Sequence, residues 1–179
     1  MPLKSNLLSR VTGSLFGVIA VVVGVHEGRS LVSYQDPAGV WTICDGETLG
    51  VKPGQKVTQA QCDETLRKGI ARHAEALRDL PQDLPDVVLL GAIDSAYNVG
   101  VYGFRGSSAA KCLANKDYTC ASKNWLKWKY ITLPNGKKFD CSTPGNKVCS
   151  GLWDRRQWQA KALGNQFKSV QEALAALPR

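Results

Sequence analysis

The sequence predicts an α+β protein in which a small antiparallel sheet accompanies a mainly helical larger lobe. Short apolar pieces alternate with glycines and a Pro-Gly pair over residues 34–57, a spacing typical of strands joined by tight turns. Most of the chain after residue 57 instead carries apolar residues at helical spacing. With 179 residues, the chain fits one domain of two lobes that buries about 70% of its unfolded surface.

The helices can be ordered from their start and stop signals. Thr58 and Gln61 form a Thr-x-x-Gln capping box, so we expect a helix from residue 59 to Leu80, joining the two lobes. Asp86–Val99 is apolar on almost every side, which predicts a buried central helix. Further along, we expect breaks at Gly100 and Gly103, helices over residues 107–113, 119–130 and 151–163, a hairpin over residues 131–150, and a short helical pattern in residues 164–179.

An uncharged run, residues 11–25, follows Lys4 and Arg10 near the start of the chain. A positive end before an apolar run resembles a signal peptide or a signal anchor. No small-x-small cleavage site lies between the run and Glu27. As a helix the run would cover about 22 Å, less than the bilayer core of ~30 Å. We therefore expect a weak, uncleaved anchor, with an ordinary buried first helix of a soluble domain as the alternative.

The charge and the cysteines limit the partners. A net charge of +8 favours an anionic partner, but no zinc spacing, RNP-like strand or dense basic helix accompanies it. We therefore expect an anionic wall polymer and no nucleic acid. Six cysteines without Cys-x-x-Cys spacing, and only two histidines, predict disulfides of an oxidising compartment and no metal or cofactor. Of fifteen connectivities, the one closing the shortest loops pairs Cys44 with Cys62, Cys112 with Cys120 and Cys141 with Cys149.

Three side chains in residues 26–48 carry the candidate chemistry: Glu27, Asp36 and Thr42. Breaking an acetal bond requires two carboxyl groups that flank it. Glu27 follows the apolar run at an expected helix C-terminus, a setting that favours the protonated form, whereas an Asp-Pro turn keeps Asp36 hydrated and ionised. Such a contrast assigns acid and base roles, and the Thr42 hydroxyl, on an expected strand, could hold a water. Both carboxyls could instead have purely structural roles.

These residues belong to a longer pattern that resembles the phage-type lysozymes, glycoside hydrolase family 24. The pattern is Glu27-Gly28, then Tyr34-x-Asp36-x-x-Gly39-x-Trp41-Thr42-Ile43, then Gly46 and Thr48, with Ser95 to Gly100 and Gly151-Leu152-x-x-Arg155-Arg156 further along. The resemblance implies that Glu27 is the general acid and that Asp36 and Thr42 position or activate water. Relatives often have Gly-Tyr-Gly-His-Thr where this chain reads Cys44-Asp45-Gly46-Glu47-Thr48. That departure puts the pH optimum in doubt.

The resemblance also implies a lysozyme-like fold with a cleft between its lobes, and a monomer that needs no cofactor. Its reaction would be hydrolysis of the β-1,4 bond between N-acetylmuramic acid and N-acetylglucosamine in peptidoglycan, leading to host cell lysis. The N-terminus resembles that of signal-anchor-release endolysins, which implies a periplasmic enzyme first tethered to the inner membrane. Residues 1–26 would then form the anchor or first helix, and residues 27–179 the catalytic domain. A lytic transglycosylase and a non-enzymatic, membrane-tethered wall-binding protein are the alternatives.

Other residues have weaker predictions. Tyr34, Trp125 and Trp128 are candidates for binding substrate, because aromatic faces stack on sugar rings. The helical spacing of Trp125 and Trp128 is also that of a helix core. Asp94, inside the expected central helix, is predicted to be a hydrogen-bonded structural acid. Arg155 and Arg156 would either support the active-site lobe through ion pairs or be solvated.

Overall fold

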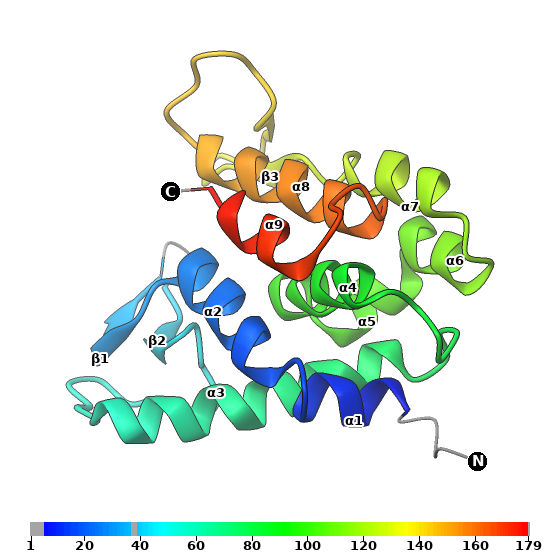
Figure 1. Ribbon diagram of the computed structural model, residues 1–179. Helices are drawn as coiled ribbons and strands as arrows, with labels where there is room; N and C mark the ends of the chain where they lie inside the picture. The colour runs from blue at the N-terminus through cyan, green and yellow to red at the C-terminus, as the bar shows by residue number, and fades with distance from the viewer. Residues whose placement is uncertain (1–5, 37–38, 179) are drawn as a thin grey trace.

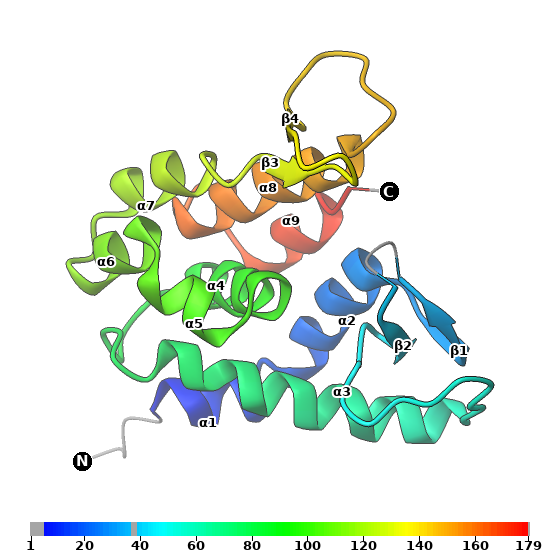
Figure 2. The same ribbon diagram turned by 180° about the vertical axis from the view of Figure 1, so that it is seen from behind.

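The computed structural model describes residues 6–36 and 39–178, so Lys4 and Pro37 lie outside the described residues. A long helix, α3 (Gln59–Ala74), runs along one side of the molecule from the β1–β2 sheet to the helical part (Figures 1 and 2). The α+β class is therefore confirmed, with two small antiparallel sheets in an otherwise helical chain. The remaining elements are α1 (Leu7–Thr12), α2 (Phe16–Glu27), β1 (Ser30–Gln35), β2 (Trp41–Cys44), a 3₁₀ helix (Glu75–Leu77), α4 (Asp86–Val99), α5 (Val101–Gly106), α6 (Ser108–Ala114), α7 (Tyr118–Trp125), β3 (Tyr130–Thr132), β4 (Lys138–Asp140), α8 (Ser150–Leu163) and α9 (Val170–Ala175).

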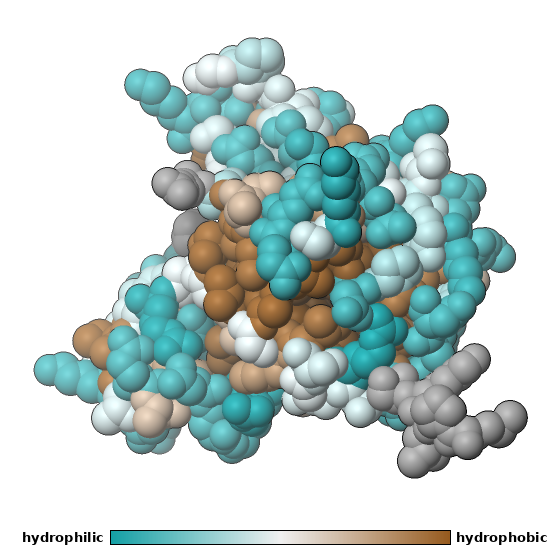
Figure 3. All heavy atoms as spheres, in the orientation of Figure 1, coloured by the Kyte–Doolittle hydropathy of each residue, from teal (hydrophilic) through white to brown (hydrophobic). Residues whose placement is uncertain are grey.

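The uncharged N-terminal run is divided between two helices. The chain breaks at residues 13–15, where Gly13 ends α1, because glycine and serine are poor helix formers. In α2, Ile19, Val22 and Val23 are fully buried, whereas Val21 and Val25 are about half exposed. Figure 3 shows apolar atoms gathered at the centre of this face of the molecule. Among the residues described, no helix combines the length and the apolar character that crossing a bilayer requires.

The first sheet lies beside the end of α2. β1 and β2 pair antiparallel with Tyr34 opposite Thr42, and Val32 makes an isolated bridge with Lys56. The small antiparallel sheet is confirmed, but β1 begins before the predicted stretch 34–57, and residues 45–57 contribute only isolated bridges at Glu47 and Lys56. A second hairpin, β3 with β4, confirms the hairpin expected after residue 131.

Two helices form the centre of the larger lobe. α4 has the predicted bounds, and every residue from Val87 to Ala96 is buried. α8 crosses it closely at Gly91, where an added Cβ would stand 2.6 Å from the Cβ of Ala162. Only a glycine permits this approach, which brings the middle of α4 against α8.

Three predicted boundaries were wrong. The helix expected to reach Leu80 keeps its capping box at Thr58 but ends at Ala74 and continues as the 3₁₀ turn. Gly103 does not break the chain, because it lies inside α5. The helix expected over residues 119–130 ends at Trp125, since Tyr130 instead pairs with Asp140 in the second hairpin. Tertiary pairing has overridden local propensity there.

All three predicted disulfides are confirmed. The Cα atoms of Cys44 and Cys62 lie 5.1 Å apart, those of Cys112 and Cys120 5.7 Å, and those of Cys141 and Cys149 5.2 Å. Cys44–Cys62 fastens the end of β2 to α3, whereas the other two close loops within the larger lobe.

The Cys44–Cys62 bond should stabilise the protein most, because it closes the longest of the three loops, with a sequence separation of 18 against 8. We expect the double substitution Cys44→Ser and Cys62→Ser to lower the free energy of unfolding by about 3 kcal/mol. Denaturant unfolding measures this. A loss no larger than that from the Cys141→Ser, Cys149→Ser control would contradict the ranking.

Candidate active site

Glu27 is the last residue of α2, as predicted. Gly28 follows with φ of +70°, donates its N–H to the Gly24 carbonyl, and turns the chain into β1. The turn after β2 passes close to the Glu27 side chain, since a Cβ added to Gly46 would stand 3.3 Å from Glu27 Oε2. The Glu27 side chain is 20% exposed, so it is mostly buried but still reaches the surface.

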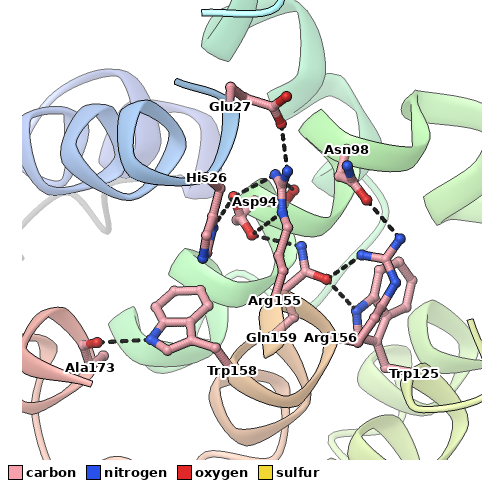
Figure 4. Close-up of polar contacts among 10 residues, drawn as sticks. All are labelled: His26, Glu27, Asp94, Asn98, Trp125, Arg155, Arg156, Trp158, Gln159 and Ala173. Atoms are coloured by element: carbon pink, nitrogen blue, oxygen red, sulfur yellow. Dashed lines mark hydrogen bonds and ion pairs between the residues drawn. The ribbon is translucent and has the colours of Figure 1, made fainter. Parts of the chain in front are cut away.

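A buried arginine, which sequence reasoning left as either paired or solvated, holds the Glu27 carboxyl. Arg155 Nη1 donates to Glu27 Oε1 at 2.7 Å, and Arg155 is only 5% exposed. The rest of its guanidinium meets Asp94, with Nη2 at 2.9 Å from Oδ1 and Nε at 3.3 Å from Oδ2. Figure 4 shows Arg155 extending from α8 between the two carboxyls.

Asp94 is the centre of this network. It is fully buried on α4 and also receives Gln159 Nε2 at 2.6 Å, while His26 Nδ1 lies 3.1 Å from its Oδ1. Burial by itself would raise the pKa of Asp94, but Arg155 and the His26 contact outweigh it and hold the pKa at about 2. Asp94 is thus a hydrogen-bonded acid, as predicted. It contacts both His26, which precedes Glu27 in the chain, and Arg155, which holds the Glu27 carboxyl.

Asp36 and Thr42 converge on the backbone of Val40. Asp36 Oδ1 accepts the Val40 N–H at 2.8 Å, and the Thr42 hydroxyl donates to the Val40 carbonyl at 3.0 Å. Thr42 is 4% exposed, on β2, which leads within a few residues to the Gly46 turn against Glu27. Glu27, Asp36 and Thr42 therefore belong to one continuous α2–β1–β2 unit.

The two acids that mark the departure from the family pattern are each paired. Asp45, 1% exposed, accepts both Nε and Nη2 of Arg29 at 2.8–3.2 Å. Glu47 pairs with Arg72 at 3.0 Å. Burial alone would raise the pKa of Glu47, but the Leu49 N–H, Arg72 and the Thr48 N–H lower it below its usual range. Asp45 and Glu47 therefore act as ion-pair partners of Arg29 and Arg72.

The aromatic candidates separate into two kinds. Trp125 is fully buried and donates from Nε1 to Gln159 at 2.7 Å, so its ring has no exposed face for a sugar. Trp128 and Tyr34 remain 37% and 41% exposed. Trp128 lies in a cavity with Ser108, Asn124, Lys127, Tyr130 and Arg156.

Comparison with known proteins agrees with this geometry. The family model described as phage lysozyme matches residues 24–159. The chain belongs to the phage lysozyme family. It is 32% identical to an endolysin of Acyrthosiphon pisum secondary endosymbiont phage 1, over 76% of this chain and 88% of that one. It is 31% identical to a SAR-endolysin of Pseudomonas phage phiKMV, over 89% of both chains.

Solved structures show the same fold for this phage lysozyme family member. An endolysin from Escherichia coli O157:H7 phage FAHEc1 superposes with a TM-score of 0.71 at 21% identity, over 85% of this chain and 94% of that one. The active form of the P1 phage endolysin Lyz superposes with a TM-score of 0.64 at 22% identity, over 89% and 92% of the two chains. The lysozyme-like fold predicted from the sequence is therefore confirmed.

Proposed function

We propose that this phage lysozyme family member is an endolysin that hydrolyses the β-1,4 bond between N-acetylmuramic acid and N-acetylglucosamine in peptidoglycan. One observation carries the proposal. The Glu27 carboxyl, held by Arg155, lies against Gly46 in the turn that follows β2, the strand that contains Thr42. Asp36 begins the hairpin loop of the same small sheet. Family membership and the resemblance of these three residues to the family pattern support the same reaction.

In this reaction the chain supplies two carboxyl groups and one hydroxyl. Glu27 gives its proton to the glycosidic oxygen as that oxygen leaves the anomeric carbon. Asp36 and Thr42 hold a water on the opposite face of the sugar, and Asp36 takes the proton that the water loses as its oxygen bonds to carbon. The backbone of Val40 orients both groups, because it accepts from one and donates to the other.

The products distinguish this hydrolysis from the alternative lytic transglycosylase reaction. We expect mass spectrometry of digested, purified peptidoglycan to show N-acetylmuramic acid reducing ends that have gained one water. A transglycosylase uses no water and would leave 1,6-anhydro ends instead. Anhydro products as the main species would overturn the hydrolytic assignment and leave the bond specificity intact.

We also propose that the N-terminal segment tethers the enzyme to the inner membrane before it acts in the host periplasm. Several relatives are SAR-endolysins, including the phiKMV protein. α2 supports this idea because it still exposes Val21 and Val25 when folded onto the domain. An apolar helix of this kind could exchange a bilayer for the protein surface.

Carbonate extraction of expressing cells tests the tether. We expect the protein in the membrane fraction while the membrane is energised, and in the soluble fraction after an energy poison. The Val21→Ser, Val25→Ser variant, which changes only exposed positions, should weaken membrane retention and leave folding intact. Protein found only in the soluble fraction before poisoning would contradict the tether.

A further inference from the structure

Residue 26 makes a buried contact that the proposed reaction does not use. The His26 side chain is 3% exposed, although it precedes Glu27 in the last turn of α2. Its Nδ1 meets Asp94 at 3.1 Å, and its ring meets the edge of Trp158, with centroids 5.3 Å apart. Trp158 is fixed in turn by a 2.8 Å hydrogen bond to the Ala173 carbonyl of α9 (Figure 4).

The other ring nitrogen shows which tautomer fits. His26 Nε2 is buried and has no hydrogen-bond partner among the described residues. A proton on Nδ1 lets it donate to the Asp94 carboxylate, which can only accept, and Nε2 is then left without a hydrogen bond. An unsatisfied buried nitrogen does not help stability, so packing alone does not account for a histidine at this position.

Asp94 contacts both His26, which precedes Glu27 in the chain, and Arg155, which binds the Glu27 carboxyl. From α4 it receives His26 of α2 and two nitrogens of Arg155 of α8, leaving Arg155 Nη1 for Glu27. We propose that His26 and Asp94 are positioning residues: Asp94 aims Arg155 at Glu27, and His26 fixes the last turn of α2 so that the Glu27 carboxyl faces the substrate. This inference rests on the proposed glycosidase function.

Asp94 also balances the charge beside the acid. Arg155 attracts the Glu27 carboxyl through its Nη1. Because two of the Arg155 nitrogens are bound to the Asp94 carboxylate, that attraction is shared between two carboxylates.

Substitutions of His26 separate positioning from packing. His26→Phe keeps a ring against Trp158 and removes the donor to Asp94, whereas His26→Asn keeps a donor near the place of Nδ1. We expect His26→Phe to lower kcat on purified walls roughly ten- to hundredfold, with KM unchanged and the melting temperature unchanged or raised. His26→Asn should recover a substantial part of kcat. Ser95→Ala is the matched control, because Ser95 Oγ, one residue from Asp94, is also buried and has no hydrogen-bond partner in the part of the chain that the structure describes.

Asp94→Asn supplies an independent measurement. It keeps the shape of the side chain but removes its charge, so Asp94 should hold Arg155 less firmly toward Glu27, and kcat should fall with KM unchanged. Hydrolysis of walls by the wild-type protein tests the proposed function. The ratio of each variant's kcat to the wild-type kcat tests the positioning role of His26 and Asp94. The proposal is overturned if His26→Phe keeps wild-type kcat, or if His26→Phe and His26→Asn lower kcat equally and Asp94→Asn keeps wild-type kcat.

Discussion

Replacing Glu27 with Gln should abolish most wall hydrolysis while leaving the protein folded. A glutamine cannot give a proton to the leaving oxygen, and loss of a general acid costs roughly 10²- to 10⁴-fold in rate. Its amide oxygen can still accept from Arg155 Nη1, so the hydrogen bond that holds the side chain at 2.7 Å need not be lost. The measurements are reducing ends released from purified walls, together with the melting temperature.

The same variant tests the non-enzymatic alternative. A tethered wall-binding protein would cause the same biological effect with Gln at position 27, whereas the enzyme would lose lysis. Glu64→Gln on α3 is a suitable control, because Glu64 is exposed and forms a surface ion pair with Lys68 at 3.5 Å. Lysis by Glu27→Gln at the wild-type rate would end the catalytic proposal for this residue.

Local sequence signals were sufficient for the elements that carry these side chains. The Thr58 capping box, the apolar stretch Asp86–Val99 and the turn residues around the first sheet each act within a few positions, and the structure has a helix or strand at each. The break at residues 13–15 was not predicted, because the uncharged run was treated as one segment.

The contacts around Glu27 could not be predicted in this way. His26 and Asp94 are 68 positions apart, and Asp94 and Arg155 are 61 apart. α4 is buried on every side, so its pattern could not show which face meets α2 and which meets α8. The Gly-Leu-x-x-Arg-Arg resemblance marked Arg155 as notable, but only the close crossing at Gly91 explains why it reaches two carboxylates.

Replacing Arg155 with Met should be the most destabilising substitution at the site. Arg155 is 5% exposed and pairs with both Asp94, which is fully buried, and Glu27. Removing one member of a buried ion pair leaves an uncompensated charge, so we expect the free energy of unfolding to fall by about 3–5 kcal/mol. Denaturant unfolding at neutral pH measures this, and wall hydrolysis should fall as well, because Glu27 loses the contact that orients it.

Replacing the neighbouring Arg156 with Met distinguishes the loss of an ion pair from the loss of packing. Arg156 is 4% exposed on the same helix, and its hydrogen bonds to the described residues go to neutral acceptors, the Trp128 carbonyl, Gln159 and Asn98. Arg156→Met should therefore cost less, about 1–3 kcal/mol. Adding Asp94→Asn to Arg155→Met removes the stranded buried charge and should restore much of the stability, but not the activity, because Glu27 remains unheld. Equal losses for the two arginines, with no recovery in the double variant, would mean that packing and not the Glu27–Arg155–Asp94 charge arrangement stabilises this site.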